Sequence, residues 1–550
     1  MTTRLSSIRN ISRRSVPTRW LLLACCALLL VLAGLRPLAV PDEGRYADIG
    51  RWMLVSGDWL TPRLNGVPFF HKPAFLYWLE AASLAVLGVN NLAARLIPAL
   101  HAALMLFGLY FAAQQFASKN IARRSALMLA SSLAFLVGGQ YVNHDMLVAA
   151  WISSAVWCFA LALNHAETSS DGTPHAWLAR AGFVACAFGV LSKGLIGVAL
   201  PGMVLFFWVL ATGQLRRVWS LPWLSGLALF CVIALPWFVL AQRAFPDMLG
   251  YMFGTQQFSR YTGTTFNNAR PWWFYGVCLL LLMFPWAFFA IKSLALSIQY
   301  KLSAPLSIAR SWLLLALIWL LSIVLFFSIP TSKIVGYMLP VMPPLALLAA
   351  LGWEHSFRAK PWEGKAFYAV WGAALLVAVG VNVAAARHSL RESSADIAAL
   401  LACMAAPGDL IYAVGDYPYD LPFITQSTKP MVLIQDWEGE RKIARDNWRR
   451  EIFEGANFEP ASATVLQTPE DLEEVEGRRG VWVVAPQRFE ITAFKFVHLG
   501  SAWTLYQSFP TADAQAAATQ ASLAKSPAST KSPQSGEQKG LPGCRNLRHD

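Results

Sequence analysis

Residues 20–46 read WLLLACCALLLVLAGLRPLAVPDEGRY, an apolar run followed at once by two acids and an arginine. The run has about the length that one membrane-crossing helix needs, roughly 20 residues. A second charged stretch, Phe70-His71-Lys72-Pro73, follows soon after. Ionisable groups near a membrane are costly to bury and usually mark a functional site. The sequence therefore predicts a membrane helix that leads directly into a loop carrying the chemistry.

The rest of the chain shares the apolar character of this first run. Of its 550 residues, 56% are hydrophobic and only 14% are charged, which is too apolar for a soluble globular protein. In lipid only helices or closed barrels satisfy every backbone group, and continuous apolar runs exclude a barrel. We expect a polytopic α-helical membrane protein with about 11–13 transmembrane helices. The candidate spans lie near residues 20–38, 92–116, 122–141, 146–164, 178–192, 195–212, 219–241, 272–291, 311–329, 335–352 and 366–385.

The basic residues indicate how the chain is oriented. The formal net charge is +13, but most of it falls in short loops between spans, so orientation explains it better than a nucleic-acid partner does. With the arginine-rich N-terminus inside, four clusters fall on the cytoplasmic side: Lys119/Arg123/Arg124, Arg216/Arg217, Lys292/Lys301/Arg310 and Arg358/Lys360/Lys365. The apolar segment 73–89 would reverse this order if it crossed. We therefore place it, and residues 42–56, along the outer surface as two juxtamembrane helices.

The character of the chain changes after the last span. Residues 1–386 form the predicted transmembrane domain, whereas residues 387–510 alternate strand-like runs with polar, helix-like stretches. This alternation predicts a small α/β domain, which an odd number of spans places outside the membrane. Residues 511–550 are of low complexity and should be disordered.

Cations on the outer side break the positive-inside rule. The residues concerned are Arg45, Lys72, Lys193, Arg260, Arg270 and Lys333. Lysine and arginine side chains that converge from separate helix ends would hold a phosphate well, and a lipid phosphate is the simplest such ligand. The eight cysteines show neither a disulfide framework nor a metal-ligand spacing.

Each of these residues also has a purely structural explanation. Asp42 could be a first-turn acid favoured by the helix dipole, although its spacing from Arg45 places both on one helix face. Asn143-His144-Asp145 could be a polar turn or a helix cap. Lys193 and Lys333 could extend from helix ends toward the interface. These alternatives stay open at the level of sequence.

Three stretches together resemble a known family. Residues 42–100, which begin DEGRYADIG and include FFHKPAF, are similar to the GT-C glycosyltransferases that use polyprenyl-phosphate-linked sugars, and LSKGLIG (191–197) and SKIVGYMLP (332–340) extend the likeness. Within that class the nearest likeness is to the transferases that place 4-amino-4-deoxy-L-arabinose on lipid A, relatives of the protein O-mannosyltransferases. The resemblance implies two juxtamembrane helices, a cavity at the outer leaflet and an inverting transfer from an undecaprenyl-phosphate-linked donor.

The resemblance also implies roles for individual residues. Asp42 matches the essential acid and Asp145 a second acid, while Lys72 matches the lysine of a Lys-Pro motif. Positions expected near the carrier phosphate correspond to Arg45, Tyr46, Lys193, Lys333 and Tyr337. Two positions depart from the family pattern. An acid commonly precedes the motif lysine where this chain has His71, and Glu-His is common where it has Gln256-Gln257, so a need for a divalent metal is left open.

These observations together predict a bacterial inner-membrane glycosyltransferase that works at the periplasmic leaflet. The expected reaction moves 4-amino-4-deoxy-L-arabinose to a lipid A phosphate, with the lipid donor, the acceptor and membrane lipids as partners. With an ionised phosphate acceptor, Asp42 would orient the nucleophile or stabilise the oxocarbenium-like centre. With a hydroxyl acceptor, Asp42 or Asp145 would serve as the general base. Transfer of another sugar to a protein or glycan is one alternative. A polyprenyl-lipid transporter is another, although it would place charges within spans and show interrupted helices.

Overall fold

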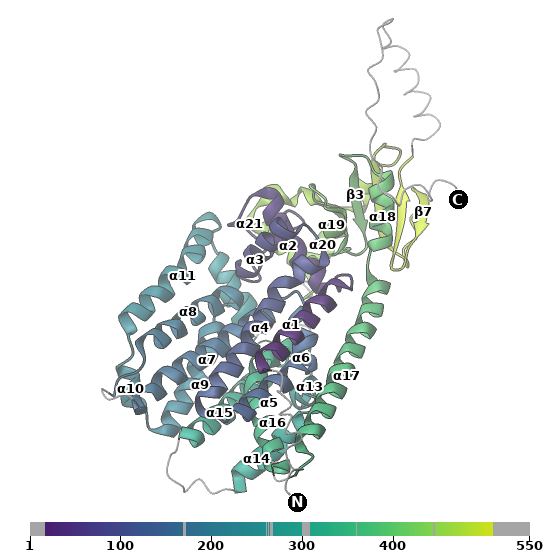
Figure 1. The fold of residues 1–550 in the computed structure, drawn as a ribbon. Coiled ribbons are helices and arrows are strands. Elements are labelled where there is room, and N and C mark those ends of the chain that lie inside the picture. The colour runs from purple at the N-terminus through teal and green to yellow at the C-terminus, as the bar shows by residue number, and fades with distance from the viewer. Residues whose placement is uncertain are drawn as a thin grey trace, which may run out of the picture.

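The computed structural model describes residues 17–168, 172–259, 261, 263, 268–299, 308–358, 360–443 and 446–509. It shows an elongated bundle of helices with a β-sheet domain at one end, and the first helix enters the bundle from the direction of the opposite end (Figure 1). The predicted disorder of residues 511–550 concerns residues outside the described ranges.

The bundle consists of helices of very different lengths. They are α1 (Thr18–Gly34), α4 (Asn91–Phe116), α5 (Lys119–Ala130), α6 (Leu133–Leu136), α7 (His144–Thr168), α8 (Ala176–Lys193), α9 (Ile196–Thr212), α10 (Leu215–Trp219), α11 (Trp223–Ala244), α13 (Phe274–Leu282), α14 (Ala287–Gln299), α15 (Ile308–Ser328), α16 (Met342–Phe357) and α17 (Glu363–Glu392). Two short 3-10 helices, η1 (Gly138–Gln140) and η3 (Val335–Val341), and one π-helix, η2 (Gly250–Ser259), complete the bundle.

Every predicted span coincides with a helix or a bent helix pair, but not all are long enough to cross alone. Among the described residues, seven helices have the length and apolarity to cross a membrane, or up to nine if each bent pair counts as one span. The predicted spans 20–38 and 195–212 correspond to α1 and α9, which have 17 residues each. The protein is a multi-pass membrane protein.

Two segments predicted as single spans are instead broken. Segment 122–141 divides into α5 and a second piece at 55°, because Ser132 starts a new helix by accepting a hydrogen bond from the Phe135 N–H at 3.2 Å. Segment 272–291 divides into α13 and α14 at 117°, where Pro285 lacks the N–H that a continuous helix requires. The expectation of a single continuous helix was wrong at both places.

Two short helices occupy the loop between α1 and α4, in the segments predicted to lie along the membrane surface. α2 (Asp42–Ser56) and α3 (Phe75–Leu87) pack on each other. Their contact requires a glycine, because a Cβ added at Gly50 would lie 2.7 Å from Cβ of Glu80. Between them, the hairpin β1 (Arg63–Leu64) and β2 (Val67–Pro68) turns at Asn65-Gly66, both in the left-handed region.

The C-terminal domain is built on a six-stranded mixed sheet. Strands β3 (Leu410–Val414), β4 (Val432–Ile434), β5 (Leu466–Gln467), β6 (Val481–Pro486), β7 (Lys495–Leu499) and β8 (Trp503–Gln507) lie in the order β5-β4-β3-β6-β8-β7. The first four in this spatial order are parallel, and β8 is antiparallel to both of its neighbours. The domain also contains α18 (Ala395–Met404), α19 (Leu421–Thr425), α20 (Trp437–Ile443), α21 (Trp448–Phe458), α22 (Pro469–Glu473) and η4 (Pro460–Val465).

The sheet domain is fastened to α2 and to the β1–β2 hairpin. The Asn65 side chain donates to the Met431 carbonyl and accepts from the Met431 N–H, both at 2.8 Å. Arg51 of α2 is fully buried and donates to the Ser427 carbonyl at 2.7 Å. These contacts fix the position of the domain relative to the helix that begins with Asp42.

Candidate active site

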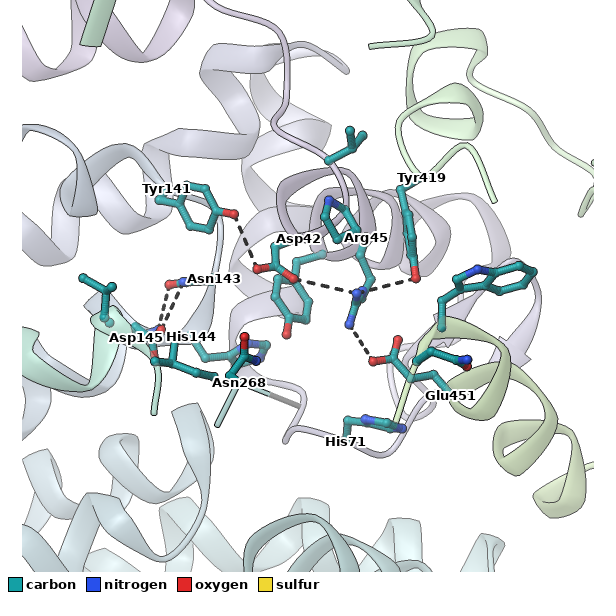
Figure 2. Close-up of a pocket in the computed structure, with 18 of the residues that line it drawn as sticks. Asp42, Arg45, His71, Tyr141, Asn143, His144, Asp145, Asn268, Tyr419 and Glu451 are labelled. Atoms are coloured by element: carbon teal, nitrogen blue, oxygen red, sulfur yellow. Dashed lines mark hydrogen bonds and ion pairs between the residues drawn. The ribbon is translucent and has the colours of Figure 1, made fainter. Parts of the chain in front are cut away.

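A cavity of about 1080 Å³ lies between the helix ends of the bundle and the sheet domain (Figure 2). Nine of the ten residues predicted for the site line it: Asp42, Arg45, Tyr46, Lys72, Asp145, Lys193, Arg270, Lys333 and Tyr337. The tenth, Arg260, lies outside the described residues. Chain segments that are far apart in sequence therefore contribute to one cavity, and the roles of these residues in it stay predictions.

Asp42 is the first residue of α2 and remains open to the cavity. Its side chain is 45% exposed, with one carboxylate oxygen 3.7 Å from the Arg45 guanidinium. The Tyr141 hydroxyl donates to the other oxygen at 3.4 Å (Figure 2). The carboxylate is thus oriented by two neighbours without being enclosed by them.

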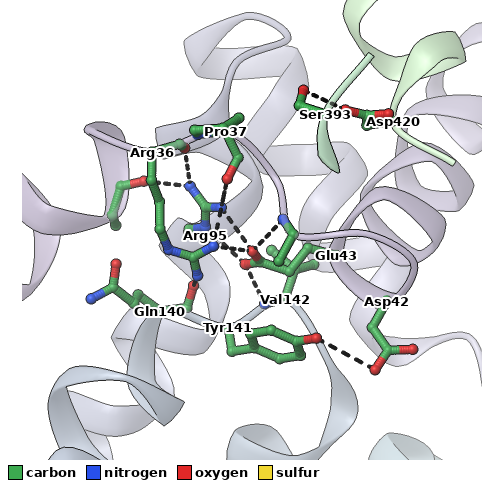
Figure 3. A network of polar contacts seen from close by, with 12 residues as sticks. Arg36, Pro37, Asp42, Glu43, Arg95, Gln140, Tyr141, Val142, Ser393 and Asp420 are labelled. Carbon is green, nitrogen blue, oxygen red and sulfur yellow. Dashed lines mark hydrogen bonds and ion pairs between the residues drawn. The ribbon is translucent and has the colours of Figure 1, made fainter. Parts of the chain in front are cut away.

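The next residue, Glu43, points away from the cavity and is completely buried (Figure 3). Arg95 donates to both carboxylate oxygens at 2.8 Å, and Arg36 forms a second ion pair. The backbone N–H groups of Ala39 and Val142 also donate, at 2.8 and 3.1 Å. Burial alone would raise the pKa of Glu43, but the two guanidiniums lower it to about 2. Glu43 therefore ties the start of α2 to the segment that carries Tyr141.

Arg45 connects the bundle to the sheet domain. Its Nη1 donates to Glu451 of α21 at 2.7 Å, and its Nη2 donates to the Tyr419 hydroxyl at 3.5 Å. The guanidinium carbon also lies 5.0 Å from the centre of the Tyr419 ring. Burial would lower the pKa of Arg45, but Glu451 raises it well above the usual value. The arginine is fully charged and held mainly by the sheet domain.

Asp145 and Lys193 form an ion pair at the cavity wall. The Lys193 Nζ bonds to one Asp145 oxygen and lies 4.5 Å from the centre of the Tyr337 ring. Asn143 donates to the other oxygen at 3.2 Å and accepts from the Asp145 N–H at 2.9 Å, so it also caps α7. A Cβ at Gly336 would lie 2.1 Å from Asp145 Oδ2, so only glycine allows this approach.

Lys333 is fixed by backbone groups. The side chain is 4% exposed and donates to the carbonyls of Arg270 at 3.1 Å and Pro330 at 2.5 Å. Its own N–H donates to the Asn268 carbonyl at 3.0 Å. The segments around residues 269 and 332 are therefore joined, which brings Arg270 and Lys333 to the same side of the cavity.

A hydrogen-bond cluster lies beside Lys72. His71 Nε2 lies 2.7 Å from the Tyr251 hydroxyl, which donates to Glu454 at 2.6 Å and accepts from the Gln256 amide at 3.0 Å. The Tyr251 hydroxyl therefore contacts both His71 and Gln256, which lie at the two positions where the chain departs from the family pattern. Within the described ranges no three His, Cys, Asp or Glu side chains gather in a way that could hold a metal ion.

The charges that line the cavity are unevenly distributed. The membrane part supplies five Lys or Arg residues and two aspartates, whereas the part after residue 386 supplies four acids and one arginine. The acids are Glu392, Asp416, Asp446 and Glu451, and the arginine is Arg488. The membrane part therefore contributes net positive charge to the lining, and the part after residue 386 contributes net negative charge.

Several residues of this region were not predicted from the sequence. Glu451 and Tyr419 come from the sheet domain, and no local pattern links them to Arg45. Arg36 and Arg95 form the ion pairs with Glu43. Both arginines lie on the predicted outer side, where the positive-inside rule makes cations uncommon, as do the cations identified from the sequence. That signal could have identified both arginines.

Comparison with known proteins agrees with this arrangement. A family profile described as dolichyl-phosphate-mannose-protein mannosyltransferase matches residues 21–252. An undecaprenyl phosphate-alpha-4-amino-4-deoxy-L-arabinose arabinosyl transferase from Shewanella sediminis is 32% identical over 337 residues, 60% of this chain and 59% of that protein. The corresponding transferase 1 of Sodalis glossinidius is 30% identical over 408 residues, 72% of this chain and 67% of that protein. The chain thus spans less than two thirds of the Shewanella relative.

The fold is also found in a solved structure. The crystal structure of ArnT from Cupriavidus metallidurans bound to undecaprenyl phosphate superposes with a TM-score of 0.73, covers 90% of this chain and 100% of that chain, and is 23% identical in sequence. At this identity the likeness concerns the fold alone. It confirms the predicted fold class, a polytopic helical membrane protein of the GT-C type with a small C-terminal sheet domain.

Proposed function

Because the chain belongs to the family of undecaprenyl phosphate-alpha-4-amino-4-deoxy-L-arabinose arabinosyl transferases, we propose that it moves this sugar from an undecaprenyl-phosphate carrier to a lipid A phosphate. The observation that carries the proposal is the cavity, in which cations from four separate segments of the bundle surround the space beside Asp42. Such a space suits an anionic lipid headgroup whose bond to a sugar is to be broken.

The lysines would stabilise the departing carrier phosphate. Cleavage of the sugar–phosphate bond develops negative charge on the phosphate, and fixed cations lower the energy of that state more than mobile ones do. Lys333 uses two of its three N–H groups on backbone carbonyls, which leaves the third for a ligand. Lys72 and Lys193 line the same cavity.

Asp42 is the better placed of the two predicted acids to act on the reacting centre. Asp145 is 8% exposed and is paired with Lys193, so it serves to fix that lysine. Asp42 is 45% exposed and faces the cavity. A lipid A phosphate is already ionised, so Asp42 would orient the sugar and stabilise positive charge at the anomeric carbon. A hydroxyl acceptor would instead require Asp42 to accept a proton.

The acids that line the cavity support an amine-bearing sugar. A protonated 4-amino group is a cation, and the carboxylates of the sheet domain are its natural partners. With the phosphate beside the lysines and the amino group beside these acids, both charges of the donor headgroup would be matched. The match to the mannosyltransferase profile favours a protein hydroxyl as the second candidate acceptor.

The orientation of the chain follows the same reasoning. The sheet domain lies at one end of the bundle, whereas α10 and α14 lie toward the other (Figure 1). Residues of the sheet domain line the cavity, so the cavity lies at the same end as that domain. The Lys/Arg clusters assigned to the cytoplasm flank these helices, as the positive-inside rule requires. We therefore place the cavity at the periplasmic leaflet of a bacterial inner membrane. The two broken helices resemble those of transporters, but the charged residues lie at helix ends, which supports an enzyme.

The test is mass spectrometry of lipid A from cells with and without this chain. We expect aminoarabinose on the lipid A phosphates only when the chain is present. Asp42→Asn should retain undecaprenyl phosphate binding and lower transfer about 100-fold or more. Glu438→Gln is the matched control, because Glu438 is 83% exposed. An unchanged lipid A spectrum with the wild-type chain would contradict the proposed acceptor, and full activity of Asp42→Asn would remove this residue from the mechanism.

A further inference from the structure

The ion pair between Arg45 and Glu451 joins two distant parts of the chain at the cavity. Arg45 lies in the first turn of α2, and Glu451 lies in α21 of the sheet domain. The two side chains are 12% and 13% exposed and are 2.7 Å apart. An ion pair that is shielded from water is much stronger than one at the surface. This contact is therefore a defined part of the cavity wall.

Glu451 competes with Asp42 for the same guanidinium. The i, i+3 spacing of Asp42 and Arg45 on one helix would allow a direct ion pair. That ion pair is present at 3.7 Å, but Arg45 contacts Glu451 more closely, at 2.7 Å. The Arg45 Nη2 atom, which is the one nearest Asp42, also donates a hydrogen bond to the Tyr419 hydroxyl of the sheet domain at 3.5 Å. The sheet domain thus draws the arginine away from the exposed carboxylate (Figure 2).

The position of Glu451 is fixed by its surroundings. Arg51, two turns along α2 from Arg45, is bound to the Ser427 carbonyl. The reciprocal bonds between Asn65 and Met431 hold the hairpin to the same domain. The sheet domain cannot shift relative to α2 without breaking these contacts. These contacts, together with the packing of α21 on β2, place Glu451 beside Arg45.

We propose that Glu451 is a positioning residue of the transferase, which holds Arg45 back so that the Asp42 carboxylate stays available to the sugar. This inference rests on the proposed function and extends it by giving the sheet domain a direct part in the reaction. Among the described residues, Asp42 is the other carboxylate that pairs with Arg45, so without the Glu451 charge the arginine is drawn toward Asp42. The arginine then closes on Asp42 and blocks the face that would approach the anomeric carbon.

Glu451→Gln should separate chemistry from binding. The amide has nearly the shape of the carboxylate but no charge, so the domain stays in place while Arg45 is released. We expect kcat to fall about 10- to 100-fold, the effect of losing one charge-assisted hydrogen bond. The KM for the donor and the affinity for undecaprenyl phosphate should change less than about 3-fold. Glu451→Asp keeps the charge and should recover most of the loss.

The experiment uses the full chain in lipid nanodiscs, with undecaprenyl-phosphate-linked aminoarabinose and lipid A. Glu438→Gln, in the same domain, is the control with unchanged kcat. Arg45→Met supplies the decisive background, because no guanidinium can then close on Asp42. In that background Glu451→Gln should have no further effect on kcat.

Two outcomes would overturn the inference while leaving the proposed function intact. One is a wild-type chain that transfers the sugar and a Glu451→Gln variant with the same kcat. The other is an equal loss from Glu451→Gln with and without Arg45, which would indicate a merely structural role. A wild-type chain that transfers no aminoarabinose would contradict the proposed function itself, and this inference with it.

Discussion

Replacing Glu43 by glutamine should destabilise the protein strongly although the two residues have almost the same shape. Glu43 is completely buried and accepts hydrogen bonds from Arg36, Arg95 and two backbone N–H groups. Its pKa of about 2, against an ordinary 4.5, corresponds to about 3 kcal/mol of stabilisation at neutral pH. Breaking a buried ion pair by removing one partner typically costs about 3–5 kcal/mol. We therefore expect a loss in the free energy of unfolding of about 3–5 kcal/mol.

The pH dependence gives an independent check of this reasoning. Because the pKa of Glu43 is lower in the folded protein, the stabilisation is fully present above pH 4.5 and is lost as the pH falls toward 2. The difference between wild type and Glu43→Gln should therefore shrink over this interval. Unfolding in mixed detergent micelles, followed by tryptophan fluorescence, measures both curves.

A double variant tests whether the effect comes from the arginine left behind. Adding Arg95→Met to Glu43→Gln removes one unpaired buried cation, so the combined loss should be smaller than the sum of the two single losses. Glu438→Gln, at an exposed ion pair, should change stability by less than about 1 kcal/mol. A loss below about 1 kcal/mol for Glu43→Gln, or a pH-independent loss, would refute the assignment of Glu43 as a buried anchor.

Two further predictions concern the cavity and the attachment of the sheet domain to the β1–β2 hairpin. Lys193→Gln removes a cation from the cavity and leaves Asp145 without its ion pair. The Kd for undecaprenyl phosphate, measured by titration in nanodiscs, should therefore rise about 10-fold or more. An unchanged Kd would remove Lys193 from the phosphate site. Asn65→Ala removes both hydrogen bonds to the Met431 backbone, which should lower the local stability by about 1–3 kcal/mol. Hydrogen exchange of the backbone amides in β4 should therefore become faster. Equal exchange rates in the variant and the wild type would show that the hairpin does not hold the domain.

The sequence allowed most of the fold to be predicted because the bilayer imposes a length and an apolar composition on every span. It did not allow the two breaks to be predicted, because they depend on local groups within otherwise apolar runs. Ser132 starts a new helix through its side-chain oxygen, and Pro285 removes one backbone donor. Both residues are visible in the sequence. Neither changes the hydropathy of its segment enough to mark a boundary.

The candidate site was predictable only in part, for a similar reason. The lysines and arginines at helix ends stood out because they lie on the side where cations are uncommon. Glu451 could not be identified in this way, since it lies 406 residues from Arg45 and belongs to an ordinary amphipathic helix. The partner of a residue across a tertiary contact leaves no trace in local spacing. The structure supplies this information.

The attachment of the sheet domain to α2 limits how such a chain can be rearranged during evolution or in the laboratory. Domains joined by a linker can be exchanged between relatives, because few contacts cross the boundary. Here the bonds from Arg51 and Asn65 cross it, so a chimera that imported a foreign C-terminal half would also have to import residues 42–68 to match. Two segments that are far apart in the sequence, residues 42–68 and the C-terminal domain, must therefore be exchanged together.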